Sequence, residues 1–202
     1  MINLLPLALA IGPVAVAPAT PGSVTPVVVP AQDGSMTVAG VTLPGSVEVD
    51  GHTLVLNGVG LRKKSIIKVY VGGLYLPSKQ SSADQILAAD APRRMVLQFL
   101  RNVGRDNMCN AWDESLKNNT PDASPELRRQ FAQLCDWMED IKHGEQFVFT
   151  YVPGKGTEVE VAGKVKGVIA GKDFADALFR SWIGPKPAPG TGFKQSVLGW
   201  KG

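Results

Sequence analysis

The sequence is poor in the residues that build metal sites, with two histidines and two cysteines among 202 residues. His52 lies in a hairpin-turn sequence, and His143 precedes Gly144 at an expected helix end, where the helix dipole favours a cationic side chain. Neither histidine has a partner at metal-binding spacing, and two cysteines without a clustered histidine are too few for a structural zinc site. We therefore expect no metal site.

Familiar catalytic motifs are also missing. The sequence has no Gly-x-Ser-x-Gly nucleophile elbow, and neither Gly58/Gly60 nor Gly154/Gly156 completes a phosphate-binding fingerprint. The net charge is only +3, with Lys and Arg scattered among acidic residues, so the charge pattern gives no indication of nucleic-acid binding. The 44% hydrophobic and 19% charged content is instead typical of one ordinary globular domain.

Charged side chains are absent from residues 1–32. Leu4–Ala17 is apolar and is followed by small residues up to Ala19, which is typical of a secretory signal peptide with an Ala-x-Ala cleavage pattern. A membrane anchor is the alternative, but proline and glycine interrupt the run, and a spanning helix needs about 20 apolar residues. We expect residues 1–19 to be a signal peptide, 20–38 a flexible leader and 39–200 the folded domain. The protein would then be periplasmic or secreted, without stable membrane insertion after cleavage.

Export bears on Cys109 and Cys135, because an oxidising compartment favours a disulfide. The sequence predicts one helix starting near Asp106 and a second opening at Ser124-Pro125-Glu126, joined by a short loop at 118–123, hence an antiparallel hairpin. The two cysteines are centred on this loop, at equal height on the facing helices. A disulfide there would add ~3 kcal/mol. Two buried free thiols are the alternative.

The hydrophobic pattern predicts an α+β fold with an antiparallel sheet. Strands are expected at 41–43, 47–49, 53–57, 66–76, 94–100, 146–152, 157–162 and 164–169, and further helices at 83–89 and 174–182. The apolar stripe of the second hairpin helix is Leu127, Phe131, Leu134, Cys135, Met138 and Ile141. A glycine turn is expected at 58–62. Gly72-Gly73, inside the longest strand, indicates a bulge or a close approach of another segment.

Arg62 is the strongest candidate for a binding residue. It follows the expected glycine turn and opens the longest strand, which carries Tyr70 in its middle. Arginine presents five donors in a fixed fork suited to a carboxylate, enolate or phenolate, and a buried tyrosine hydroxyl would add a neutral donor. The alternative is a solvated strand-end arginine and a packed aromatic ring. Spacing alone leaves both interpretations open.

Several segments of the chain carry a family resemblance. They are Gly58-Val59-Gly60-Leu61-Arg62, Ile67-Lys68-Val69-Tyr70-Val71-Gly72-Gly73-Leu74-Tyr75-Leu76, Phe99-Leu100-Arg101 and Ala177–Gly184. Together they resemble the chalcone isomerase family, particularly its bacterial isomerase-like branch, over about Val41–Leu198. The resemblance implies an open-faced β-sandwich made of a large antiparallel sheet covered by helices and a smaller sheet.

The resemblance also implies roles for Arg62 and Tyr70. In the plant isomerases the arginine that matches Arg62 polarises the substrate ketone. In the fatty-acid-binding members, arginine and tyrosine at positions like Arg62 and Tyr70 hold a carboxylate. This chain has the tyrosine where the isomerases have a threonine. Where they place a tyrosine and an asparagine, it aligns Arg105 and Trp112.

The resemblance therefore favours a non-catalytic protein that binds a small amphipathic ligand, such as a fatty acid, through Arg62, Tyr70 and Trp112. The acyl tail would lie among apolar side chains such as Val69, Trp112 and Phe131. One alternative is an intramolecular lyase (isomerase) with Arg62 as its catalytic residue, acting on an enone. Another is haem, for which His52 and His143 are the available histidines. Neither the role of Arg101 nor the oligomeric state follows from the sequence.

Overall fold

The computed structural model describes residues 34–200, so the expected signal peptide (1–19) lies outside the described residues. The strands are β1 (Met36–Val38), β2 (Val41–Leu43), β3 (Ser46–Val49), β4 (His52–Lys64), β5 (Ile67–Leu76), β6 (Arg93–Phe99), β7 (Gln146–Val152), β8 (Gly156–Val161) and β9 (Lys164–Ile169). The helices are α1 (Ala83–Ala88), α2 (Arg105–Asn119), α3 (Pro125–Asp136), α4 (Lys172–Ile183) and α5 (Thr191–Val197). None of the helices in this range is both long and apolar enough to cross a membrane.

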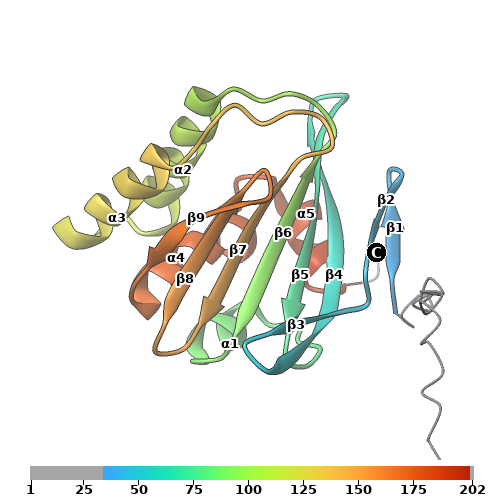
Figure 1. The fold of residues 1–202 in the computed structure, drawn as a ribbon, viewed down its shortest axis with the longest axis horizontal. Helices are drawn as coiled ribbons and strands as arrows, with labels where there is room; N and C mark the ends of the chain where they lie inside the picture. The colour runs from blue at the N-terminus through green and yellow to red at the C-terminus, as the bar shows by residue number, and fades with distance from the viewer. Residues whose placement is uncertain (1–33, 201–202) are drawn as a thin grey trace, which may run out of the picture. The chain divides into compact units, whose positions relative to one another are not determined.

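Strands β3 to β9 form one antiparallel sheet in which every strand pairs with its neighbour in sequence (Figure 1). One face of this sheet packs with the helices into a core that includes Leu74, Phe149 and Trp182. The other face carries a second apolar cluster, to which the β1–β2 hairpin contributes Val41 and Leu43. The predicted α+β architecture, with a large antiparallel sheet, a smaller sheet and a helical layer, is confirmed.

Two short elements depart from the expected order. Met36–Val38, expected at the end of the leader, forms β1 and pairs with β2, so these residues are part of a strand. Helix α5 was not predicted from the sequence. It packs against β4 and β5 near the end of the chain.

The expected glycine turn at 58–62 is wrong, because β4 continues unbroken through it to Lys64. The true turn lies at Ser65 and Ile66. The glycines permit close packing instead. Gly60 and Gly72 face one another across β4 and β5, and the Phe193 ring of α5 lies so near that an added Cβ would be 2.7 Å and 2.5 Å from it. The expectation of a close approach at Gly72 is therefore confirmed.

Helices α2 and α3 form the expected hairpin, which is closed by a disulfide between Cys109 and Cys135 with a Cα–Cα distance of 5.2 Å. Ser124 caps α3 by accepting a hydrogen bond from the Leu127 N–H. The predicted stripe overruns the helix, which ends at Asp136. Ile141 is buried as expected, but its backbone exchanges two hydrogen bonds with Val103, at 2.9 Å and 3.0 Å, and this pairing excludes a helix there.

Candidate ligand-binding site

A cavity of about 520 Å³ lies between one end of the sheet and the helices α2 and α4. Its lining combines side chains from the ends of β4, β5 and β6, the loop after β6, the first half of α2 and the end of α4. The residues are Arg62, Lys64, Ile67, Val69, Tyr70, Leu97, Phe99, Arg101, Asn102, Val103, Gly104, Asn107, Met108, Asn110, Ala111, Trp112, Glu114, Ser181, Trp182 and Ala188. Arg62, Tyr70 and Trp112, singled out from the sequence, are brought together here.

Strand pairing places Arg62 next to Tyr70. The two are direct partners in the antiparallel β4–β5 register, and the register shifts immediately after Arg62. Direct partners project their side chains from the same face of a sheet, which explains why both reach the cavity. Arg62 is half-buried, and within residues 34–200 it forms no ion pair and no side-chain hydrogen bond. Its guanidinium donors are therefore available to an acceptor in the cavity.

The Tyr70 phenol is held neutral by its surroundings. Its ring packs edge-to-face against Phe99 and Phe193, with centroids 5.6 Å and 5.8 Å away. Burial raises the pKa of Tyr70 to about 12, although the Trp182 side chain and the positive charge of Arg62 act in the opposite direction. At neutral pH the site therefore offers a protonated phenol beside a cationic guanidinium.

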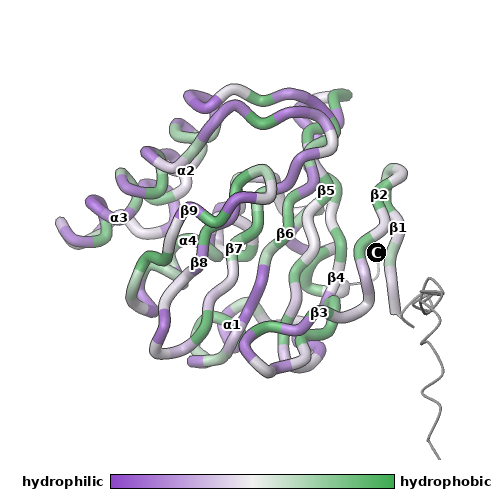
Figure 2. Tube along the Cα trace, in the orientation of Figure 1, coloured by the Kyte–Doolittle hydropathy of each residue, from purple (hydrophilic) through white to green (hydrophobic). Residues whose placement is uncertain are grey.

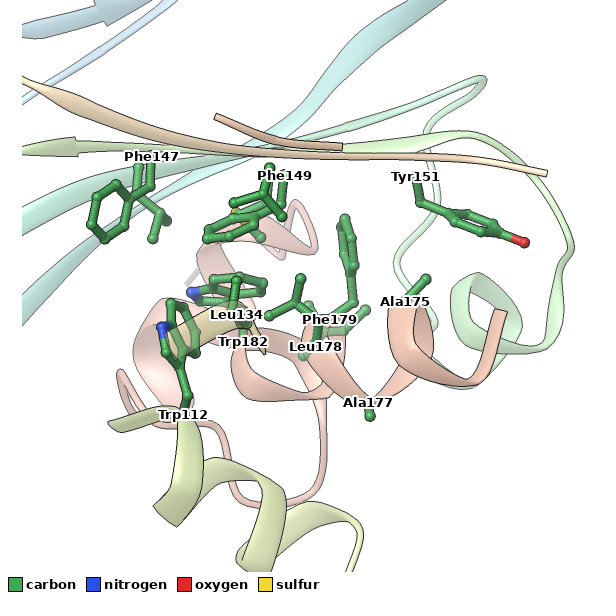
Figure 3. Packing of buried hydrophobic residues seen from close by; sticks show 14 of the residues in the cluster. Trp112, Leu134, Phe147, Phe149, Tyr151, Ala175, Ala177, Leu178, Phe179 and Trp182 are labelled. Carbon is green, nitrogen blue, oxygen red and sulfur yellow. The ribbon is translucent and has the colours of Figure 1, made fainter. Parts of the chain in front are cut away.

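Two indole rings form the wall opposite the sheet. Trp112 of α2 packs edge-to-face against Trp182 of α4 at 5.7 Å and against Phe149 of β7 at 5.6 Å (Figure 3). The Trp112 Nε1–H is buried and has no hydrogen-bond partner among the described residues. A buried donor without a partner costs about 1–3 kcal/mol. Trp112 is also one of the residues that line the cavity.

The mouth of the cavity is mainly cationic. Lys64 and Arg101 are exposed lining residues, and neither forms an ion pair within the described part of the chain. Glu114 is the acidic side chain among the lining residues. Together with Arg62, these cations give the opening an excess of positive charge, which favours an anionic group.

Comparison with known proteins agrees with this fold and chain order. A family profile described as chalcone isomerase-like matches residues 35–199. The chain belongs to the chalcone isomerase-like family. Among solved structures, this chalcone isomerase-like protein is similar to an Arabidopsis thaliana fatty-acid binding protein, AtFAP1, at 22% sequence identity and a TM-score of 0.64. The alignment covers 81% of this chain and 95% of AtFAP1. No curated protein sequence matches the chain significantly.

Some residues considered from the sequence lie outside the cavity of this chalcone isomerase-like protein. Phe131, expected near an acyl tail, is buried in the core against Phe174, at 5.4 Å between ring centroids, because α3 packs behind α2. Arg105 bonds the Cys135 carbonyl at 3.2 Å instead of lining the cavity. His52 and His143 are both exposed and do not line it, so a histidine-ligated haem does not fit this site.

Sequence reasoning missed two polar residues, Asn107 and Asn110, which line the cavity from the first turns of α2. With Ala111 and Glu114 they recur at helical spacing, beside the apolar positions of Met108 and Trp112. That second stripe is the signal that could have identified them. The cavity thus contains asparagines, although the alignment places Arg105 and Trp112 where the isomerases have a tyrosine and an asparagine.

Proposed function

We propose that this chalcone isomerase-like protein binds the carboxylate of a fatty acid or a similar amphipathic acid, with Arg62 and Tyr70 holding the head group. The observation that carries the proposal is the unpaired Arg62 guanidinium inside the cavity, beside the neutral Tyr70 phenol. Hydrogen bonds between charged groups are stronger than neutral ones, and a guanidinium can bind both oxygens of a carboxylate.

Two further hydrogen-bond donors near Arg62 also suit a carboxylate ligand. The Tyr70 hydroxyl and the Trp112 indole N–H can each donate to an oxygen acceptor, and Trp112 can only donate. A carboxylate has about four lone-pair sites, enough for these groups and Arg62 together. An amine or other cationic ligand would face donors and positive charge without a matching acceptor. The inner end of the cavity therefore favours an anion.

The remaining lining suits an acyl chain. Val69, Leu97, Phe99, Met108 and Trp182 present apolar surface around the donors. The volume, about 520 Å³, falls within the ~300–1,000 Å³ typical of small-molecule sites. The similar fold of AtFAP1, a fatty-acid binding protein, supports this ligand class.

The test is extraction of lipids from the purified protein, followed by mass spectrometry. We expect wild-type protein to carry a fatty acid or related acid in stoichiometric amounts, and Arg62→Met to lose most of it. Arg129→Met is the matched control, because Arg129 is an exposed residue of α3 outside the cavity lining. Ligand-free wild-type protein that also fails to bind added fatty acids would contradict the proposal.

We also propose that the protein acts in the periplasm or outside the cell, after cleavage following Ala19. The Cys109–Cys135 disulfide supports this location, because disulfides persist in oxidising compartments. N-terminal sequencing of protein recovered from the periplasmic or secreted fraction tests it. We expect Thr20 as the first residue; full-length protein retained in the cytoplasm would contradict it.

A second candidate function is an intramolecular cyclisation of an enone. The pair formed by Arg62 and the neutral Tyr70 phenol, with Asn107 and Asn110 in the lining, provides donors that could polarise a substrate ketone. A chalcone assay with wild-type protein separates the two functions. Absorbance loss no faster than the spontaneous rate excludes this substrate class.

A further inference from the structure

The turn between β4 and β5 exposes hydrophobic side chains beside the cavity. We call residues Lys63–Lys68 the β4–β5 tip. Ile66 at its apex is 91% exposed, and its neighbour Ile67 is 46% exposed. For comparison, Val165 on β9, another exposed hydrophobic residue, is 59% exposed. Ser65 has a φ of 56°, which closes the turn and leaves Ile66 at its end. Figure 2 shows hydrophobic colour at the end of this hairpin, flanked by hydrophilic colour. Such a protruding apolar residue gains nothing from the fold of its own chain.

The same tip carries three unpaired cations. Lys63, Lys64 and Lys68 are exposed, and none forms an ion pair or a side-chain hydrogen bond within residues 34–200. No acidic residue lies in the tip itself. An exposed apolar residue surrounded by lysines is suited to the surface of an anionic bilayer. There, hydrophobic side chains enter the boundary between head groups and acyl chains, and lysines contact the head groups.

The position of the tip links it to the cavity. Ile67 and Lys64 belong to both the tip and the cavity lining, so the apex lies beside the cavity mouth. Figure 1 shows the turn between β4 and β5 at one end of the sheet. A membrane touching Ile66 would bring the mouth, with Arg62 and Arg101 behind it, close to the head groups. An amphipathic acid could then pass between bilayer and cavity without crossing bulk water.

We infer that the β4–β5 tip docks this protein on anionic lipid bilayers, with Ile66 entering the interface and Lys63, Lys64 and Lys68 contacting the phosphates. A bilayer fits this tip better than a protein partner, because stable protein interfaces bury at least about 1,000 Å², more than a six-residue turn can supply. The docking itself does not depend on the proposed function; only its role in ligand transfer does.

Vesicle co-sedimentation of the mature protein tests the inference. We expect binding to vesicles of equal parts phosphatidylcholine and phosphatidylglycerol, weakening as salt is added, and little binding to pure phosphatidylcholine. Ile66→Ser should weaken binding about ten-fold, since it removes one buried apolar side chain. Lys63→Gln with Lys68→Gln should weaken it about 25-fold, at about five-fold for each lysine.

Matched controls are Val165→Ser on β9 and Lys117→Gln in the last turn of α2, both exposed and outside the cavity lining. Both should bind the anionic vesicles like wild type. Equal binding to neutral vesicles, or undiminished binding by Ile66→Ser, would overturn the inference. So would analytical ultracentrifugation showing that Ile66→Ser dissociates a dimer, because the tip would then be a contact between protein copies.

Fatty-acid titration in solution keeps the two proposals separate. Ile66, Lys63 and Lys68 do not line the cavity, so their variants should bind fatty acid in the absence of vesicles as wild type does. Wild-type protein that docks on vesicles but binds no fatty acid would overturn the proposed function and leave the docking inference standing. The reverse result would overturn the docking inference alone.

Discussion

Two arginines mark the two ends of the helix-covered face of the sheet, and their surroundings differ. Arg93, at the start of β6, is 1% exposed and pairs with Asp176 of α4. It also donates to the Ile86 carbonyl at 3.0 Å and lies 4.9 Å from the centroids of both the Tyr151 and Phe179 rings. Arg62, at the far end of β4, has no ion pair among the described residues and faces a cavity.

The contrast indicates a structural role for the buried Arg93 and a binding role for the half-buried Arg62. At the Arg93 end, partners fill the space between sheet and helix and neutralise the charge, as a structural ion pair must. Figure 3 shows Tyr151 at this end of α4 and Trp112 at the other. At the Arg62 end, the whole Arg62 guanidinium and the Trp112 indole N–H lack partners among the described residues, whereas Arg93 leaves only its Nε–H unpaired. The first arrangement holds the fold together, whereas the second leaves donors for a ligand.

We call the Arg93 end, where protein partners fill the space, the closed end, and the Arg62 end, which borders the cavity, the open end. The largest expected effect is on the free energy of unfolding after a substitution at the closed end. Arg93→Met should lower the free energy of unfolding by about 3–5 kcal/mol, because Asp176 keeps only Lys172 as a partner and the Ile86 carbonyl loses its buried donor. Arg62→Met, the matched substitution at the open end, should change it by less than about 1 kcal/mol. Denaturant unfolding measures both. Equal destabilisation of the two variants would contradict the structural difference between the two ends.

The next effect concerns the helix that forms the wall of the open end. Replacing both Cys109 and Cys135 with serine should lower stability by ~3 kcal/mol, because the disulfide no longer restricts the unfolded chain. Reductant should produce the same loss in wild type and none in the double variant. Unfolding that is unaffected by either change would show that the bond contributes nothing to stability.

A smaller effect is expected on fatty-acid affinity, when the tyrosine at each end is replaced by phenylalanine. Tyr70→Phe should weaken fatty-acid binding about ten-fold, the loss of one hydrogen bond to an ionised acceptor, as measured by calorimetry. Tyr151→Phe is the control, because the Tyr151 hydroxyl donates to Asp90 at 2.6 Å away from the cavity. It should leave affinity unchanged. Equal loss in both variants would contradict a specific role for Tyr70.

The last effect is a pH dependence of stability that appears only in strongly alkaline solution. Burial raises the pKa of Tyr70, Tyr75 and Tyr151 to about 12. Since the folded-state pKa lies above the unfolded value of about 10, these neutral phenols stabilise the fold fully below pH ~10, and the contribution disappears as pH rises through the folded pKa of about 12. Titration of phenolate absorbance in folded and in denatured protein measures these pKa values. Phenolate formation by these three tyrosines near pH ~10 in the folded protein would contradict the raised pKa values.

Much of the fold followed from local patterns. Strand β7 was predicted at its observed bounds, 146–152, and Ser124-Pro125-Glu126 opens α3, because alternation and capping depend on neighbouring residues. The same local reasoning failed at Gly58 and Gly60. Glycine is read as a turn former there, but distant packing is what requires it, because the end of α5 approaches both positions. The Ser196 carbonyl oxygen would lie 2.2 Å from a Cβ at Gly58, and the Phe193 ring 2.7 Å from one at Gly60.

The residues of the site could also be predicted only in part, because their arrangement depends on contacts between distant parts of the chain. Arg62 and Tyr70 were chosen from the resemblance, but their pairing depends on the β4–β5 register, which puts them side by side. Asn107 and Asn110 form a polar stripe that the sequence contains, but such a stripe is also typical of a solvated helix face, and only the tertiary packing shows that it borders a cavity. Whether the predicted residues bind a ligand stays a prediction.

The central claim is that Arg62 recognises a carboxylate, and comparing an acid with the alcohol of the same chain length tests it most directly. Calorimetry on delipidated protein should show that wild type binds palmitic acid about ten- to a hundred-fold more tightly than hexadecanol, as a charge-assisted hydrogen bond is worth about 1.5–3 kcal/mol. In Arg62→Met that preference should disappear while alcohol binding persists. An acid-to-alcohol ratio unchanged by the substitution would contradict the account.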